Sequence, residues 1–184
     1  MSSVGHTESN TPEDIKGLWQ TPRWFFDYWN RYYQFAADIA ASDLNHLVET
    51  FFTEQDDALT MDFSELRGRY VYCNPPYRDL KPWIELFARN ARDYGIGTVA
   101  LLPADTSTKW FKLAAETADQ IVFITGGRLS FVRADTQESV GGNTKGSVVV
   151  IYHNRADRLQ EDSGGSCSFY CKDRDFIKSI SDIT

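Results

Sequence analysis

Arg69-Tyr-Val-Tyr-Cys-Asn-Pro-Pro-Tyr77 is the stretch that decides how this sequence folds. Its first five residues favour β-structure and the prolines end that run abruptly, which predicts a buried strand over 69–73 followed by a rigid turn. A proline forces the residue before it out of the helical region, so Asn74 and Pro75 are both held extended. We therefore expect a strand that presents Asn74 at its carboxyl end.

The chain on either side of this turn alternates between helix and strand patterns. Aromatic residues at helical spacing after Pro22 predict a helix over 22–33, and apolar spacing predicts helices over 80–93 and 110–118. Buried strands are expected, in chain order, over residues 35–41, 69–73, 98–102, 121–124 and 147–152. This alternation predicts an α/β fold whose sheet is mostly parallel.

The polar segments set the expected domain organisation. Residues 1–16 are rich in Ser, Thr, Glu and Asn and are expected to form a disordered arm, followed by a single domain over 17–153. Residues 154–184 are expected to be a polar tail, with a short docked helix as the alternative. The polar stretch 128–146 is a candidate DNA-contacting or lid loop, with disorder as its alternative.

Composition limits the classes of partner. A formal net charge of -7 argues against a surface that binds phosphates throughout, so any contact with nucleic acid has to be local. The three cysteines, Cys73, Cys167 and Cys171, lack metal-ligand spacing, and neither a disulfide framework nor a metal site is expected. No segment approaches the ~20 apolar residues of a membrane span. We expect a cytoplasmic monomer without a membrane partner.

The turn after residue 73 offers a socket for an amino group. The Asn74 side-chain carbonyl and the Pro75 backbone carbonyl can accept both hydrogens of one exocyclic NH2, and Pro76 has no N–H to compete for them. Tyr77 offers a flat face for the attached ring. The alternative is a rigid turn with an aromatic cap and no chemistry.

Such a socket suits methylation of an aromatic amine. The lone pair of this amine is delocalised into its ring, and accepting its two protons in bent geometry helps to localise the pair toward an incoming methyl group. A paired base has to be flipped out of the duplex at a cost of a few kcal/mol, of which stacking on Tyr77 offsets roughly 1–3 kcal/mol.

Acidic residues near the predicted strand ends suggest a cofactor site. Asp38 and Asn74 both lie toward the carboxyl ends of predicted strands, where ligands bind in open α/β sheets. Asp38 can meet a cationic amino group or a hydroxyl, and Asp56 or Asp57 can accept from ribose hydroxyls or an adenine amine. A solvated acidic turn is the alternative for Asp56 and Asp57.

Several motifs follow one another in a fixed order between residues 19 and 152. They are Trp19-Gln-Thr-Pro22, Asp38-Ile-Ala-Ala-Ser42, Phe52-Thr-Glu-Gln-Asp-Asp57, Cys73-Asn-Pro-Pro-Tyr77, Leu102-Pro-Ala-Asp-Thr-Ser-Thr108 with Trp110, and Gly127-Arg-Leu-Ser-Phe131. In this order they resemble the phage and prophage DNA N-6-adenine methyltransferases of the Dam type.

The resemblance implies a Rossmann-like, S-adenosylmethionine-dependent methyltransferase sheet with helices on both faces, acting on double-stranded DNA. The catalytic pocket that it implies consists of Asn74, Pro75, Pro76 and Tyr77. The cofactor contacts that it implies come from Trp19, Thr21, Pro22, Asp38, Ile39, Ala40, Ser42, Asp56 and Asp57. It also implies protection of phage DNA from restriction. GATC, a common target of Dam-type enzymes, is one candidate target, and the residues themselves do not specify the recognised sequence.

The chain departs in three respects from the usual pattern of S-adenosylmethionine-dependent DNA methyltransferases, although this family often lacks the first feature. Ala40, Ala41 and Ser42 stand where most S-adenosylmethionine enzymes carry a Gly-rich loop, and Ala58 follows Asp57 where relatives tend to carry Gly. The chain is too short for a separate target-recognition domain, so loops have to contact the DNA. The candidate DNA-binding residues are Arg78, Lys109, Arg128, Arg133, Asn143 and Lys145, with ordinary surface charge as the alternative.

Two other functions fit parts of this pattern. One is a different amino methyltransferase, acting on N-4 of cytosine or on a protein glutamine. Asn74 argues against the cytosine enzymes, which tend to carry Ser or Asp there, and the missing Gly-rich loop argues against the glutamine enzymes. The other is a nucleic-acid-binding protein that keeps the fold without turnover.

Overall fold

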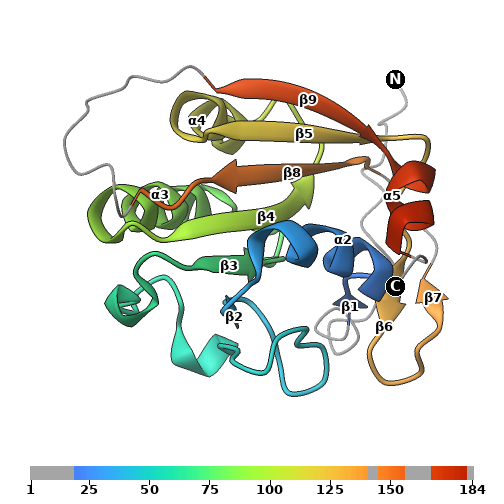
Figure 1. Cartoon of the computed structure of the whole chain (residues 1–184), viewed down its shortest axis with the longest axis horizontal. Helices are drawn as coiled ribbons and strands as arrows, with labels where there is room; N and C mark the ends of the chain where they lie inside the picture. The colour runs from blue at the N-terminus through green and yellow to red at the C-terminus, as the bar shows by residue number, and fades with distance from the viewer. Residues whose placement is uncertain (1–18, 141–144, 156–166, 182–184) are drawn as a thin grey trace, which may run out of the picture.

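The central element of the computed structural model, which describes residues 19–140, 145–155 and 167–181, is a six-stranded sheet (Figure 1). In spatial order its strands are β2 (Ala37–Asp38), β3 (Tyr70–Cys73), β4 (Gly97–Pro103), β8 (Ser147–Tyr152), β5 (Gln120–Thr125) and β9 (Ser168–Asp173).

The sheet is mainly parallel, as the sequence predicts. β2, β3 and β4 run parallel to one another, and β5 runs parallel to β9. β8 lies between β4 and β5 and is antiparallel to both. The carboxyl ends of β2, β3 and β4 therefore lie at one edge of the sheet, where parallel sheets place their ligands.

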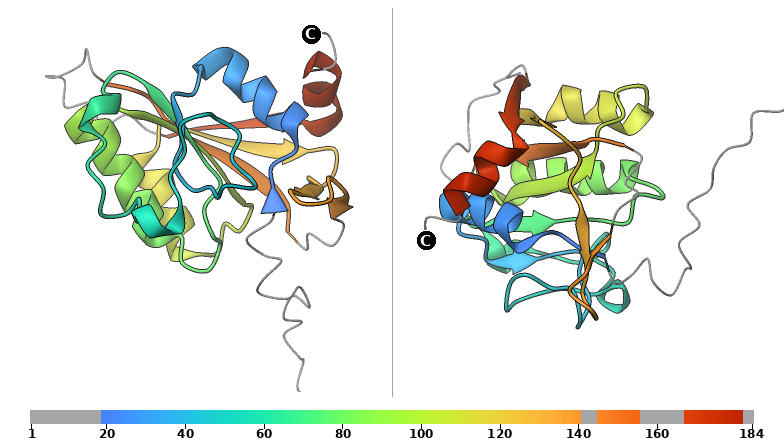
Figure 2. Two further views of the ribbon diagram at one scale, coloured as in Figure 1. Left: turned by 90° about the horizontal axis from the view of Figure 1, so that it is seen from below. Right: turned by 90° about the vertical axis from the view of Figure 1, so that its right-hand side faces the viewer.

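Helices cover both faces of this sheet (Figure 2). One face carries α2 (Arg23–Tyr33) and α5 (Arg174–Ser181), and the other carries α3 (Lys81–Arg89) and α4 (Lys109–Thr117). β8 supplies both cores because successive side chains of a strand point to opposite faces. Val148, Val150 and Tyr152 pack toward α3 and α4, whereas Val149 and Ile151 pack with α2.

Most predicted elements occur with small shifts at their ends. The helix expected from residue 22 begins at Arg23, with Pro22 as its N-cap. The helix expected over 80–93 is α3 followed by a π-helical turn, Asn90–Tyr94, which ends at Gly95 with φ 64°. The strand expected over 35–41 was too long, since only Ala37–Asp38 is strand. Two 3-10 turns, η1 (Glu54–Asp56) and η2 (Ser64–Leu66), lie between β2 and β3.

A second, smaller sheet occupies much of the region expected to be a structureless loop. Its order is β1 (Trp19–Gln20), β6 (Phe131–Arg133) and β7 (Ser139–Val140), and both pairings are antiparallel. The rings of Trp19 and Phe131 stack at 6.0 Å. The loop prediction for 128–146 was therefore wrong for these strands, while residues 141–144 lie outside the described ranges.

The region beyond residue 153 also differs from the expected polar tail. β9 extends the sheet beside β5, and α5 packs on α2 with Ile177 fully buried. The Ser181 hydroxyl donates to the Trp24 carbonyl oxygen at 2.7 Å. The described residues 168–181 thus belong to the same folded body as the sheet. The arm expected over 1–16 lies outside the described residues.

Candidate active site

Asp38 and Asn74 lie at the ends of two neighbouring strands. β2 and β3 pair in parallel with Asp38 beside Tyr72, and Asn74 follows directly after β3. Two residues that are 36 positions apart in the sequence are therefore brought to one edge of the sheet. The two strands are direct neighbours in the sheet, so the residues that follow them lie close together.

The Asn74 side chain is already hydrogen-bonded to Tyr77. The Tyr77 hydroxyl donates to Asn74 Oδ1 at 3.0 Å and also to the Leu101 carbonyl oxygen at 3.4 Å. Burial around the hydroxyl raises the pKa of Tyr77, so this group stays a protonated donor. The Tyr77 side chain remains 39% exposed, and its ring faces a pocket. The bond between these two side chains was not predicted from the sequence.

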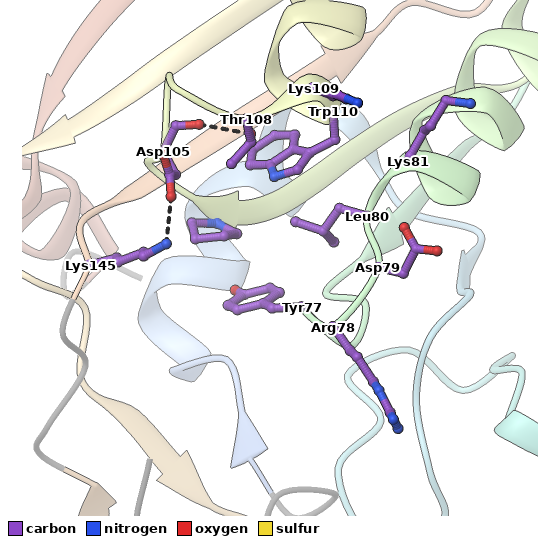
Figure 3. A pocket seen from close by; sticks show the side chains of 11 residues that line it. Tyr77, Arg78, Asp79, Leu80, Lys81, Asp105, Thr108, Lys109, Trp110 and Lys145 are labelled. Carbon is purple, nitrogen blue, oxygen red and sulfur yellow. Dashed lines mark hydrogen bonds and ion pairs between the residues drawn. The ribbon is translucent and has the colours of Figure 1, made fainter. Parts of the chain in front are cut away.

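The pocket beside Tyr77 has a volume of about 380 Å³ and lies between the N-terminal ends of α3 and α4 (Figure 3). Three of the predicted DNA-binding residues, Arg78, Lys109 and Lys145, line it together. The other lining residues are Tyr77, Asp79, Leu80, Lys81, Pro103, Asp105, Thr108 and Trp110. Four cations and two acids thus surround this pocket in a chain whose net charge is -7.

Asp105 organises one wall of the pocket. Lys145 Nζ lies 2.5 Å from Asp105 Oδ2, and the Ser107 hydroxyl donates to Asp105 Oδ1 at 2.6 Å. These two donors, with Lys145 first, lower the pKa of Asp105 to about 2. Thr108 caps α4 by accepting from the Phe111 amide, the usual role of a Thr at this position. The partnership of Asp105 with Lys145 was not predicted.

A narrow crevice lies on the other side of Asn74. Its lining residues are Trp19, Gln20, Thr21, Asp38, Ala40, Asn45, Leu47, Tyr72 and Asn74. Four of the predicted cofactor residues, Trp19, Thr21, Asp38 and Ala40, are among them. The free volume is about 10 Å³, which holds about one water molecule. A larger ligand therefore needs one wall of the crevice to move outward.

Asp38 forms the floor of this crevice. It is 3% exposed, and its two carboxylate oxygens accept from the amides of Ala40 at 3.4 Å and Leu47 at 3.3 Å. Burial raises its pKa to about 6 although these amides act in the opposite direction. A buried carboxylate of this kind favours a cationic partner.

Two of the predicted cofactor residues, Trp19 within the crevice lining and Ser42 outside it, carry buried polar atoms. Trp19 Nε1 and Ser42 Oγ are buried, and neither has a hydrogen-bond partner among the described residues. Unsatisfied buried polar groups are costly and uncommon, so both atoms suit a polar ligand. Tyr72 completes the buried end of the crevice, where its hydroxyl lies 2.8 Å from Thr21 Oγ1. The residues present therefore fit a polar, cationic cofactor.

The remaining predicted cofactor residues lie outside the crevice lining. Ile39 is 1% exposed and its side chain belongs to the core, while Pro22 is buried at the start of α2. Asp56 Oδ2 accepts from the Thr53 amide at 2.7 Å, a bond that lowers the pKa of Asp56. Asp57 has a left-handed backbone with φ 50° and accepts from Thr60. Both acids follow the bridge that joins Phe51 to Asp38.

The family model described as DNA N-6-adenine-methyltransferase (Dam) matches residues 8–173 of this chain. The chain belongs to this family. A DNA N-6-adenine-methyltransferase of Haemophilus phage HP1 (strain HP1c1) is 35% identical over 152 residues, covering 82% of this chain and 86% of the relative. A second of the same name, from Escherichia phage T1, is 33% identical over 169 residues, covering 82% and 68%.

In this Dam-family chain two of the other predicted DNA-binding residues, Arg128 and Arg133, lie outside the pocket lining. Arg133 lies on β6 and pairs with Asp135 at 2.6 Å, and the Arg128 carbonyl accepts from Arg174. Neither lines the pocket or the crevice. Asn143 falls outside the described ranges. None of the helices in the described ranges has the length and apolar character needed to cross a bilayer. Among the same residues, no three His, Cys, Asp or Glu side chains lie close enough together to hold a metal ion.

Proposed function

We propose that this chain methylates the N-6 amine of an adenine flipped out of duplex DNA, with S-adenosylmethionine as donor. The observation that carries the proposal is the position of Asn74 between two hollows. Asn74 lines the crevice, and Tyr77, the hydrogen-bond partner of its side chain, lines the pocket. A cofactor on one side and a base on the other would meet at Asn74.

The pocket is proposed to hold the flipped adenine. Its volume of about 380 Å³ lies in the range of small-ligand sites, and the exposed Tyr77 ring offers a stacking surface. Asn74 Oδ1 and the Pro75 carbonyl then accept the two amine hydrogens. The Tyr77 hydroxyl has to leave Asn74 Oδ1, at least in part, when the amine arrives. Pro76 keeps the turn rigid while this exchange takes place.

The crevice is proposed to hold the cofactor. Asp38 would face its cationic amino group, while Trp19 Nε1, Ser42 Oγ and Thr21 would bind its polar atoms. Asp56 or Asp57 would accept from ribose hydroxyls after the crevice has opened, and the backbones of Pro22, Ile39 and Ala40 would line it. When bound, S-adenosylmethionine supplies an electrophilic methyl group on sulfur. With the cofactor bound at the carboxyl ends of the parallel strands, the sheet would be of the Rossmann-like methyltransferase type.

The roles of the residues in the reaction are orientation and exclusion of water. Asn74 and Pro75 hold the amine so that its lone pair points toward the crevice, and Tyr77 fixes the plane of the ring. S-adenosylmethionine, held by Asp38 and the other residues proposed for the crevice, would supply the methyl group to the amine nitrogen, and its sulfur would keep the electron pair of the carbon–sulfur bond. The amine then loses one proton to solvent. Orientation of this kind contributes several orders of magnitude in rate.

The basic residues around the pocket are proposed to meet the DNA backbone. Arg78, Lys109 and Lys145 stand at the opening through which a flipped nucleotide would enter. Arg128, Arg133 and Asn143 belong to the segment that would contact the target sequence, with GATC as the first sequence to test. We place the protein, as a monomer, in the cytoplasm of a bacterial or phage-infected cell, where it would protect phage DNA from restriction.

The test is product identification. Purified protein is incubated with unmethylated duplex plasmid and S-adenosylmethionine labelled in its methyl group, and the digested nucleosides are identified by mass spectrometry. We expect N-6-methyladenine, with turnover lowered by about 10²–10³ in Asn74→Ala. Asn154→Ala is the matched control. Asn154 donates to the Gly68 carbonyl oxygen, just before the N-terminal end of β3, whereas Asn74 follows its C-terminal end. Labelled N-4-methylcytosine would overturn the choice of base, and absence of label would overturn the activity.

A further inference from the structure

Trp110 has an unused hydrogen-bond donor at the pocket. It is the second residue of α4, its side chain is 9% exposed, and it packs edge-on against Phe111 at 5.6 Å. Its indole nitrogen has no hydrogen-bond partner among the described residues, yet it is not sealed from solvent. The indole N–H of a largely buried Trp usually has a hydrogen-bond partner, and this one opens onto the pocket, so it is a candidate for binding a ligand there.

The indole nitrogen faces the enclosed part of the pocket. Figure 3 shows the nitrogen-bearing edge of Trp110 directed into the space that Tyr77 and Leu80 bound. The charged donors are placed differently. Arg78 and Lys81 extend away from this space, and Lys145 is paired with Asp105. The Trp110 N–H is therefore the donor best placed to reach a ring that stacks on Tyr77.

We propose that Trp110 Nε1–H donates a hydrogen bond to an unprotonated ring nitrogen of the target base. The inference rests on the proposed function and deepens it by naming a specificity residue. Adenine has such acceptors at N1, N3 and N7, whereas guanine carries a hydrogen at N1. With the amine held at Asn74, this second contact would fix the rotation of the base within the Tyr77 plane. If the base carried an N–H at the contacted position, that N–H and the Trp110 N–H would face each other, and neither would have an acceptor.

The test uses base analogues within the methylated sequence, once that sequence has been mapped from the labelled plasmid. The target adenine is replaced in turn by 1-deaza-, 3-deaza- and 7-deaza-adenine, each of which exchanges one ring nitrogen for C–H. kcat/KM is measured for the wild type and for Trp110→Phe, which keeps an aromatic ring and removes the N–H. Trp83→Phe is the matched control, because Trp83 packs against Phe87 on α3 and does not line the pocket.

We expect one analogue to lower the wild-type kcat/KM about tenfold, which corresponds to one lost hydrogen bond. Trp110→Phe should show the same loss with adenine and no further loss with that analogue, while Trp83→Phe behaves as wild type. Equal wild-type rates with all three analogues would overturn the inference, whether or not the variant folds. So would an analogue effect that persists unchanged in Trp110→Phe. A wild type that labels no adenine would instead overturn the proposed function.

Discussion

The Tyr77 hydroxyl donates to Asn74 Oδ1 across 3.0 Å, so the acceptor proposed for the adenine amine is occupied before any base arrives. The two residues lie on one turn but line different hollows, Asn74 the crevice and Tyr77 the pocket. The bond therefore joins the proposed cofactor and base sites. It holds the Asn74 carbonyl oriented in the free protein, and an entering amine has to replace it.

Tyr77→Phe is predicted to lower the KM for target DNA. The variant keeps the stacking ring but removes a hydrogen bond worth ~1 kcal/mol that competes with the amine, so KM should fall about fivefold. The same change removes the group that orients Asn74, and kcat should fall by less than about tenfold. Steady-state kinetics with a target duplex measure both constants. Tyr170→Phe, on the exposed strand β9, is the control. An unchanged KM in Tyr77→Phe would mean that the amine does not displace the hydroxyl.

Asp38 is predicted to make cofactor affinity depend on pH. Its pKa of about 6 lies above the ordinary value of 3.8, so the folded protein without ligand loses stability as the pH rises from about 4 to 6. A cationic cofactor binds the ionised form, and its affinity should rise over the same range. Calorimetry should give an S-adenosylmethionine Kd roughly tenfold weaker at pH 5 than at pH 7.5, because only about a tenth of Asp38 is ionised at pH 5.

Two variants separate the contribution of Asp38 from that of its neighbour His46, which interacts with it electrostatically. Asp38→Asn should bind S-adenosylmethionine weakly at both pH values, so that its Kd no longer depends on pH. His46→Gln should keep the pH dependence of the Kd, because His46 bonds to the Ser42 carbonyl and does not line the crevice. A flat wild-type profile between pH 5 and 7.5 would show that Asp38 does not face the cationic group.

The pattern of residues predicted the centre of the sheet but not its margins. β3, β4, β5 and β8 are apolar runs bounded by turn residues, and such runs can be recognised locally. β6 and β7 are short and lie in a largely polar stretch, and β6 gains its partner from β1, more than 100 residues earlier. β9 is largely exposed and exists as a strand through its pairing with β5. Tertiary pairing of this kind leaves no local signature.

The candidate site shows the same division. Asn74 and Asp38 could be identified because prolines and strand ends constrain the chain locally. The salt bridge between Asp105 and Lys145 joins residues 40 positions apart, and the pocket wall formed by Trp110 depends on how α4 packs on the sheet. Neither the salt bridge nor the position of Trp110 can be predicted from the spacing of residues in the sequence. The donor–acceptor bond between Tyr77 and Asn74 spans three residues, but it depends on side-chain orientation that the sequence does not encode locally.

Lys109 is predicted to contribute one phosphate contact. It lines the pocket and forms no ion pair within the described residues. Lys109→Ala should weaken duplex binding at low salt and reduce the slope of log K against log salt concentration by about 1. The wild-type slope should itself be shallow, because the net charge is -7 and few phosphates are neutralised. Lys178→Ala, on the opposite face in α5, is the control. A steep wild-type slope that Lys109→Ala leaves unchanged would place the DNA elsewhere.

Helix α5 is predicted to stabilise the whole domain although it lies in a stretch that looks like a polar tail. Ile177 is fully buried against the aromatic face of α2, so Ile177→Ala should lower the free energy of unfolding by about 2–5 kcal/mol. Phe176→Ala is the matched control, since Phe176 is 53% exposed and surface changes usually stay within about 0.5 kcal/mol. Denaturant titration followed by tryptophan fluorescence measures both values. Because Ile177 lines neither the crevice nor the pocket, the folded Ile177→Ala protein should keep its affinity for S-adenosylmethionine. Equal stability of Ile177→Ala and wild type would show that α5 does not pack on α2 in solution.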